Sequence, residues 1–387
     1  GSGRVGGDGV MAKLGEVCKL NMGQSPDSSS YNDTGDGIPF FQGNADFGEV
    51  HPNIRVWCNA PTKIAHPGEI LISVRAPIGA MNIADCECCI GRGLASISAD
   101  EAVCTTKYLW YGISSKIEEL NAKGTGSTFK AVNKKTLEET EIPIRDLMEQ
   151  ERIAAKLDSV TALITLRKRQ VKKLDELVKA RFVEMFGNPK DNKKEWNRVP
   201  LKKVAEVRGR VGWKGYKKED LQESGPLVLG ATHLTENGNI DLSSPVYLSR
   251  DKYEESPEIM LHRNDLVFTQ RGNTIGKVGL VKEDIGEATI NPCVLILRPT
   301  NIHPIYLDVY FIMDEVKKDM WRLNAGSAQP MITQKGISEY LLMLPPIELQ
   351  NQFAAFVERV DQQKQTVQQG LEKLELMKKA LMQENFG

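Results

Sequence analysis

The strongest constraint on the fold is an internal repeat, in which two segments are related by a shift of 200 residues. Residues 174–187 read LDELVKARFVEMFG, and residues 374–387 read LELMKKALMQENFG. A repeat of this length predicts two copies of one structural unit rather than a single irregular core. The same shift relates other positions upstream: Gln150 with Gln350, Ala154 with Ala354, Ala155 with Ala355, and Gly126-Ser127 with Gly326-Ser327.

Each copy contains a heptad pattern whose seam positions alternate between steps of four and three. The first seam runs from Ile153 to Met185, and the second runs from Phe353 to Asn385. This spacing predicts two long helices, each with an apolar stripe for a partner helix. Lys364 interrupts the second seam and Arg167 the first, and we expect both to specify how the helices pair.

Local signals set the boundaries of the predicted helices. Asp146 with Glu149 resembles a capping box, Gly187 precedes a stop at Pro189, and a Pro-Pro pair opens the second helix. The predicted organisation is a Gly-rich tag, a globular domain, a central helix, a second globular domain and a C-terminal helix. The corresponding ranges are 1–10, 11–145, 146–187, 188–345 and 346–387.

The regions ahead of the two helices also match one another. Residues 67–75 (PGEILISVR) align with 263–271 (RNDLVFTQR), and residues 13–17 (KLGEV) align with 203–207 (KVAEV). Short strands and turns rich in Gly, Asn and Pro predict two similar α+β domains. We expect the two helices to separate these domains as an antiparallel coiled coil, with a pseudo-two-fold relationship between the halves.

Composition excludes some classes of protein. No apolar run approaches the roughly 20 residues of a membrane helix, and an odd count of seven cysteines without a signal peptide favours reduced thiols. Cys86, Cys88 and Cys89 lack a second pair at zinc-site spacing, so we expect buried thiols on a strand edge and no metal. The net charge of −1 hides a basic stretch at residues 202–218, which Trp213 and Tyr216 interrupt.

The chain resembles the specificity subunits of type I restriction-modification systems over essentially its whole length. The motifs that carry the resemblance are QERIA at 150–154, LQNQFA at 349–354, WNRVPL at 196–201, and the Phe-Gly that ends each repeat. The second glutamine motif departs from the first, with Asn351-Gln352 in place of Glu151-Arg152.

The resemblance implies that each globular domain is a target recognition domain that reads one half of a split, asymmetric DNA sequence. It implies methyltransferase and restriction (translocase) subunits as partners, with S-adenosylmethionine and ATP bound by those partners and no cofactor in this chain. It also implies a non-catalytic protein, and the odd count of cysteines without a signal peptide predicts a cytoplasmic one. A coiled-coil scaffold without DNA binding and a stand-alone DNA-binding regulator remain as alternatives.

Two motifs that could carry chemistry are incomplete. Residues 272–278 (GNTIGKV) are one residue short of a phosphate loop and have Val278 where Ser or Thr should bind magnesium. Residues 291–294 (NPCV) lack the second proline and the aromatic residue of an adenine methyltransferase motif. Neither motif supports a catalytic site.

Reading of DNA sequence needs Arg or Lys for guanine and Asn or Gln for adenine, presented from loops that can enter a groove. Arg75 and Arg271 are the strongest candidates because they occupy the same position of the repeat, although either could bridge a carboxylate instead. The other candidates of the first domain are Gln24, Gln42, Asn44, Arg92 and Lys130, with Lys134 and Lys135 as phosphate contacts. Those of the second domain are Arg210, Lys214, Thr232, His233, Asn273, Lys277 and Gln329.

Overall fold

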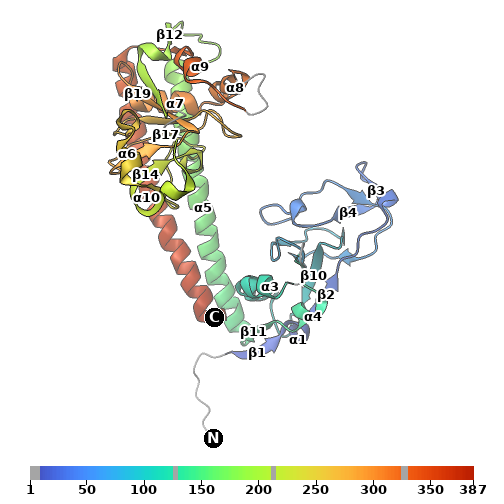
Figure 1. The fold of residues 1–387 in the computed structure, drawn as a ribbon. Helices are drawn as coiled ribbons and strands as arrows, with labels where there is room; N and C mark the ends of the chain where they lie inside the picture. The colour runs from blue at the N-terminus through green and yellow to red at the C-terminus, as the bar shows by residue number, and fades with distance from the viewer. Residues whose placement is uncertain (1–8, 125–129, 211–214, 324–329) are drawn as a thin grey trace. The chain divides into compact units, whose positions relative to one another are not determined.

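The computed structural model describes residues 9–124, 130–210, 215–323 and 330–387. It contains two compact units, of which unit 1 is Gly1–Leu166 with Gly370–Gly387 and unit 2 is Arg167–Gln369. Each unit joins a β-rich domain to part of both long helices, α5 (Leu147–Phe186) and α10 (Ile347–Phe386) (Figure 1). The α+β architecture with two packed long helices is confirmed, and the division between the units falls within the helices.

The domain of unit 1 is built on two main sheets and a short strand pair. A four-stranded antiparallel sheet has the order β2 (Cys18–Met22), β10 (Leu94–Ala99), β7 (Ile70–Ser73), β8 (Met81–Ile83). A five-stranded sheet has the order β3 (Tyr31–Asn32), β5 (Trp57–Cys58), β4 (Ile38–Phe41), β9 (Cys88–Ile90), β6 (Ile64–Ala65). The remaining elements are β1 (Val10–Lys13) paired with β11 (Glu141–Ile144), and helices α1 (Leu14–Val17), α2 (Thr106–Ser115), α3 (Ile117–Lys123) and α4 (Lys134–Glu138).

Unit 2 repeats the topology of the four-stranded sheet and has a smaller second sheet. Its four-stranded sheet has the order β13 (Ala205–Gly209), β19 (Val294–Pro299), β16 (Leu266–Thr269), β17 (Val278–Leu280). Its second sheet has the order β15 (Tyr247–Leu248), β14 (Leu221–Leu229), β18 (Ala288–Ile290). The other elements are β12 (Arg198–Pro200) paired with β20 (Leu341–Met343), and helices α6 (Arg250–Glu254), α7 (Pro304–Ile312), α8 (Asp314–Leu323) and α9 (Gln334–Ser338).

The structure corrects two details of the repeat at the start of each domain. Leu14 donates its backbone N–H to Thr140 O, and Leu201 donates its own to Tyr340 O, both at 2.9 Å. Leu14 therefore corresponds to Leu201, and the predicted match of 13–17 with 203–207 is three residues out of register. Val10, predicted to belong to the tag, pairs with Ile144 in the β1–β11 ladder. The tag's first eight residues lie outside the described part of the chain.

The central strands β7 and β16 are buried along their whole length because both faces are covered. Ile70 and Ile72 enter the core that contains the helices of unit 1, while Leu71 enters a second core with Phe41. In unit 2, Leu266 and Phe268 point to one core and Val267 to the other. A strand covered on both faces has a continuous apolar sequence instead of alternation, which explains ILIS and LVFT.

The two long helices lie antiparallel to each other within each unit. In unit 1, Val160 and Ile164 of α5 pack against Leu371 of α10. In unit 2, the Phe182 and Phe353 rings lie 5.6 Å apart between centroids. The expected seam departs from the structure near the end of α5, because Phe182 and Phe186 are buried where the heptad positions 181 and 185 were expected. A helix with 3.6 residues per turn drifts from a strict heptad, and here the drift turns both rings toward Tyr306 of the domain.

The two polar interruptions of the seam differ in their roles. Lys364 Nζ lies 2.5 Å from Asp175 Oδ1 of α5, so Lys364 makes the contact between the helices that the prediction requires. Arg167 instead donates to Gln170 Oε1 on its own helix at 2.8 Å and is exposed. The prediction for Arg167 was therefore wrong.

All seven cysteines are free, and five of them are buried. Burial raises the pKa of the Cys18, Cys88 and Cys104 thiols to about 12. Cys88 and Cys89 lie in β9, which is hydrogen-bonded to β4 and β6 on its two sides, so they occupy an inner strand rather than the expected edge. Among the described residues, no group of three or more His, Cys, Asp or Glu side chains could hold a metal ion.

None of the described helices is long and apolar enough to cross a membrane.

Candidate nucleic-acid interface

Three loops of unit 1 meet around the hydroxyl of Ser25, and they bring predicted residues together. Gln42 Nε2 donates to Ser25 Oγ at 3.0 Å, and the backbone N–H of Arg92 donates to the same oxygen at 3.2 Å. Gln24 precedes Ser25 and donates its backbone N–H to Ile90 O at 3.0 Å. The side chains of Gln24, Gln42 and Arg92 are exposed, and Asn44 follows at the start of a 3-10 turn, Asn44–Asp46.

Arg75 and Lys130 lie at the neighbouring edge of the same domain. Val74 donates its backbone N–H to Gly93 O at 2.9 Å, beside Arg92, and Ala76 donates to Lys130 O at 3.1 Å. Arg75 itself forms an isolated β-bridge with Ala131, and its side chain is exposed. Five predicted residues of unit 1 therefore occupy one connected set of loops, the unit 1 loop cluster: Gln24, Gln42, Arg75, Arg92 and Lys130.

Arg271 occupies the corresponding place in unit 2. It forms an isolated β-bridge with Met331, 200 residues beyond the Ala131 that bridges Arg75. Its backbone N–H donates to Cys293 O at 3.2 Å, and its exposed side chain donates through Nη2 to Met331 Sδ at 3.2 Å. The equivalence of Arg75 and Arg271, inferred from the repeat, holds in the backbone geometry.

Two candidates of unit 2 are buried and serve the fold. Arg210 is 7% exposed, donates through Nε to Ile290 O at 3.0 Å and through Nη2 to Thr289 Oγ1 at 3.2 Å, and lies over the Tyr216 ring. His233 is 6% exposed, and its Nδ1 accepts the backbone N–H of Gly230 at 3.1 Å. We therefore place neither side chain among the groups available to a ligand.

The remaining candidates are spread more widely. Thr232 and Asn273 are exposed, whereas Lys277 is half-buried with its Nζ 3.4 Å from Glu236 Oε1. Lys134 and Lys135 are exposed on α4, with Nζ 3.2 Å from Glu138 and 3.8 Å from Glu139 respectively. Lys214 and Gln329 lie outside the described residues.

The basic stretch at 202–218 does not form one free positive surface in its described part. Lys202 Nζ lies 2.5 Å from Glu339 Oε1, Arg208 pairs with Glu206, and Lys217 lies 3.4 Å from Glu219. Glu339 reaches Lys202 through a tertiary contact, whereas Glu206 and Glu219 are neighbours in sequence of the residues they pair with. The count of positive charges in this stretch therefore overestimated the free positive surface.

The structure also brings out residues that sequence analysis missed. Ser25 joins the three loops of unit 1, and Asn291 stands beside Gly230 at the corresponding loops of unit 2. Asn291 belongs to the incomplete NPCV motif. Strand β18 pairs in parallel with β14, as β9 pairs with β4, and this equivalence of β18 and β9 reveals the position of Asn291. Residues 272–278 connect β16 directly to β17, so a strand follows this loop where a phosphate loop would begin a helix.

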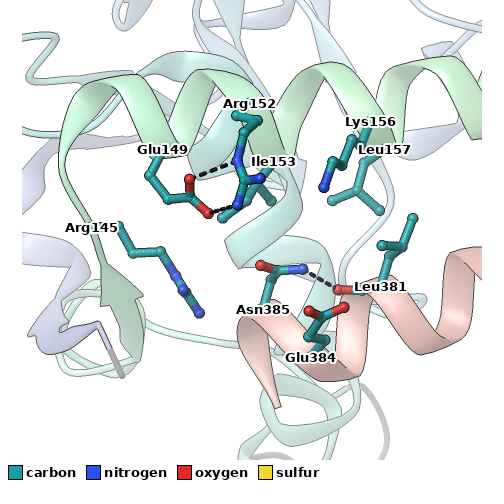
Figure 2. A pocket seen from close by; sticks show the side chains of 9 residues that line it. All are labelled: Arg145, Glu149, Arg152, Ile153, Lys156, Leu157, Leu381, Glu384 and Asn385. Atoms are coloured by element: carbon teal, nitrogen blue, oxygen red, sulfur yellow. Dashed lines mark hydrogen bonds and ion pairs between the residues drawn. The ribbon is translucent and has the colours of Figure 1, made fainter. Parts of the chain in front are cut away.

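A polar hollow of about 350 Å³ lies in unit 1 between the start of α5 and the end of α10. Figure 2 shows Arg145 reaching toward Asn385 and Glu384, while Arg152 forms two hydrogen bonds to Glu149 at 2.6 and 2.7 Å. Unit 2 has Phe353 and Phe356 at the positions of Ile153 and Lys156, and Phe353 packs between Phe182 and Phe186. The two helix junctions are therefore built differently, one polar and one aromatic.

Comparison with known proteins decides the family. The family model of the type I restriction modification DNA specificity domain matches two segments of the chain, residues 8–176 and residues 193–376. The chain belongs to this family. Each match covers most of one domain together with much of the long helix that follows it. Family membership confirms the resemblance found in the sequence, and the specificity-subunit family is non-catalytic.

Individual relatives agree. The specificity protein is 40% identical over 179 residues to a putative type I restriction enzyme MjaX specificity subunit of Methanocaldococcus jannaschii, covering 46% of this chain and 42% of that relative. It therefore spans less than half the length of that protein. It is 20% identical to the type I restriction enzyme EcoBI specificity subunit of Escherichia coli over 90% of this chain and 78% of the relative. The fold resembles the crystal structure of a type I restriction-modification system S subunit from M. genitalium, with a TM-score of 0.58, 15% identity, and coverage of 99% and 97%.

Proposed function

We propose that this chain recognises a bipartite, asymmetric DNA sequence and directs methyltransferase and restriction subunits to it. The target recognition domains are residues 11–145 and 188–345, and the helices at 146–187 and 346–387 are the spacer. S-adenosylmethionine and ATP bind to the partner subunits, and this chain binds no cofactor. The free thiols of its seven cysteines suit a reducing compartment, so the proposed location is the cytoplasm.

The observation that carries this proposal is the repetition of one fold with different side chains on equivalent loops. The order of strands in the four-stranded sheet is the same in both units, and an exposed arginine follows its central strand in each. The other groups on those loops differ, since Gln42 and Arg92 in unit 1 correspond to Gly230 and Pro292 in unit 2. Similar scaffolds with different loop chemistry suit the reading of two different half-sequences.

The chemistry of the loops fits duplex DNA. Arginine pairs in a bidentate manner with guanine, and side-chain amides pair with adenine, on edges exposed in the major groove. Unit 1 offers Arg75, Arg92 and Gln42 from one loop cluster. Unit 2 offers the exposed side chains of Arg271, Thr232 and Asn273, of which Asn273 lies two residues after Arg271. Lys130, Lys134 and Lys135 supply positive charge for phosphate contacts in unit 1.

The test is selection from a randomised duplex library by the full chain, alone and with its methyltransferase subunit. Enrichment of two short blocks separated by a fixed spacer, stronger with the partner, supports the proposal. Tight selection of a site by the chain alone, unchanged by the partner, would indicate a stand-alone regulator. No enrichment under either condition would indicate a scaffold, for which the net charge of −1 is no obstacle.

A further inference from the structure

The two units present one side-chain amide at the same place, but from opposite loops. In unit 1 the amide belongs to Gln42, which follows β4 and lies over Gly91, so that a Cβ at position 91 would come 2.7 Å from Gln42 Oε1. In unit 2 the amide belongs to Asn291, which follows β18 and lies over Gly230, so that a Cβ at position 230 would come 2.3 Å from Asn291 Nδ2.

The backbone shows that these positions are equivalent. Gly91 donates its N–H to Phe41 O at 2.8 Å, and Asn291 donates its N–H to Leu229 O at 2.8 Å. Position 42 therefore corresponds to 230, and position 91 corresponds to 291. In each unit a glycine on one loop makes room for the amide side chain of the other loop. The amide is on the first loop in unit 1, at Gln42, and on the second loop in unit 2, at Asn291.

The loop that carries Asn291 is held from several sides. Asn291 Oδ1 accepts the backbone N–H of Cys293 at 2.8 Å, and Gln270 Nε2 donates to Pro292 O at 3.0 Å. Arg210 holds the preceding strand through Ile290 O and Thr289 Oγ1. In unit 1 the corresponding carbonyl, Ile90 O, is bound by the backbone N–H of Gln24 instead. Arg210 is thus a positioning residue for this loop.

The amide nitrogen of Asn291 is left available. Asn291 Oδ1 accepts one hydrogen bond, from Cys293, and its second lone pair can accept another, whereas Nδ2 has no hydrogen-bond partner among the described residues. The side chain is half-buried. Arg271 lies beside it, because its backbone N–H donates to Cys293 O at 3.2 Å. A fixed amide next to an exposed arginine is a pair that can read an adenine and a guanine on one groove face.

We infer that Asn291 is a base-contacting residue of unit 2 that selects an adenine in its half of the site, from the place that the Gln42 amide occupies in unit 1. This inference rests on the proposed function, because it assigns one readout within the recognised sequence. An amide loses its adenine preference when its donor is removed, even if the loop keeps its shape.

The experiment selects sites from a randomised duplex library with the full chain in complex with its methyltransferase subunit. Asn291→Asp keeps the oxygen that accepts the Cys293 N–H and removes the free donor, so it separates readout from loop shape. Asn291→Gly removes the amide, and Gly230→Gln combined with Asn291→Gly moves an amide to the loop that carries it in unit 1. The control is Asn301→Asp, at an exposed asparagine elsewhere in unit 2.

We expect changes in base preference in one half-site only, the half read by unit 2. That half is identified as the one whose base preference changes in Arg271→Ala. Asn291→Asp and Asn291→Gly each reduce preference for one A·T pair there by about five-fold to about a hundred-fold. The double variant restores a preference at that pair, and Asn301→Asp leaves the motif unchanged. The other half-site stays as in the wild type throughout.

Contrary outcomes distinguish this inference from the proposed function. If the wild-type complex selects a two-part motif and the Asn291→Asp complex keeps the same adenine preference, the assignment is overturned. The proposed function is unaffected by that result. A half-site of unit 2 without any preferred A·T pair also overturns the assignment. A wild-type complex that selects no motif overturns both.

Discussion

The side-chain carbonyl oxygen of Gln350 accepts a hydrogen bond from the backbone N–H of His303 at 2.8 Å. Gln350 Nε2 donates to Pro345 O at 2.8 Å, and the side chain is 1% exposed. Gln150 makes the same arrangement in unit 1, where its Oε1 accepts from the N–H of Thr105 at 2.9 Å. The repeated glutamine therefore fastens the first turn of each long helix to the domain that precedes it.

Replacement of Gln350 by leucine keeps the volume of the side chain and removes both hydrogen bonds. The N–H of His303 and the carbonyl of Pro345 then remain buried without partners, at a cost of about 1–3 kcal/mol each. We expect Gln350→Leu to lower the free energy of unfolding of unit 2 by about 2–4 kcal/mol. Urea unfolding followed by circular dichroism measures this difference.

Gln352→Leu is the matched control, because Gln352 lies on the same helix and is exposed. Its substitution should change the unfolding free energy by less than about 0.5 kcal/mol, as for other surface positions. An equal loss for both variants would show that hydrophobicity of the helix surface, and not the buried amide, causes the effect.

The parts of the fold that depend on local patterns could be predicted from the sequence. The heptad spacing and the end signals at Asp146 and Gly187 indicated α5 almost to the residue, since Glu149 N–H donates to Asp146 Oδ1 at 2.9 Å. The repeat in the sequence related Gln150 to Gln350 but did not indicate their role. That role depends on Thr105 and His303, which are distant in sequence.

Equivalent residues of the two candidate interfaces could be matched from the sequence only where both units use the same residue at the same position. Arg75 and Arg271 satisfied this condition. Asn291 did not, because unit 1 has a glycine, Gly91, at the equivalent position. The amide of unit 1 is instead on Gln42, in a loop that only strand pairing brings beside Gly91. Arg210 was included because its neighbours in sequence are basic, whereas its burial is decided by Ile290 O across the sheet.

Arg271→Ala should relax the sequence preference of one half-site only. A bidentate contact between arginine and guanine is worth about 1–3 kcal/mol of discrimination, so preference for one G·C pair should fall by that amount. Arg75→Ala should have the same effect on the other half-site. Competition binding of the complex to single-base variants of the selected duplex measures both effects.

Arg322→Ala provides the comparison for Arg271, since Arg322 is an exposed arginine of unit 2 that pairs with Asp319 at 3.0 Å. It should leave every base preference unchanged. If Arg271→Ala weakened binding to all sequences equally, the arginine would be a phosphate contact and the prediction of base readout would be wrong.

Removal of Lys134 and Lys135 should act on affinity without altering sequence preference. Their ion pairs with Glu138 and Glu139 are exposed and contribute little to stability, so the double alanine variant should fold normally. Each lysine that no longer neutralises a phosphate should reduce the slope of log affinity against log salt by about one. We expect a reduction of about two, measured by titrations over a range of salt concentrations.

Lys107 gives a control in the same unit, because it is an exposed lysine whose Nζ lies 2.7 Å from Asp158. Lys107→Ala should leave the salt slope unchanged. A slope that stays constant in the double variant would place Lys134 and Lys135 away from the DNA.

Asp308 should make the stability of unit 2 depend on pH. Its side chain is 4% exposed and its Oδ1 has no hydrogen-bond partner among the described residues. Burial raises the pKa of this carboxyl from 3.8 to about 7, although the Lys282 ammonium acts in the opposite direction. The folded state therefore keeps a proton that the unfolded state releases.

Because the folded pKa lies above the unfolded one, the contribution of Asp308 is most favourable below about pH 4 and is lost as pH rises through about 7. Each pH unit in this window costs about 1.4 kcal/mol, and the total is at most about 4 kcal/mol. Asp308→Asn keeps the shape and cannot ionise, so its melting temperature should exceed that of the wild type increasingly from pH 5 to about pH 7 and then by a constant amount to pH 8. Asp251→Asn, at an exposed position, is the control, and a constant difference between Asp308→Asn and the wild type across this range would show that Asp308 is ionised in the folded protein.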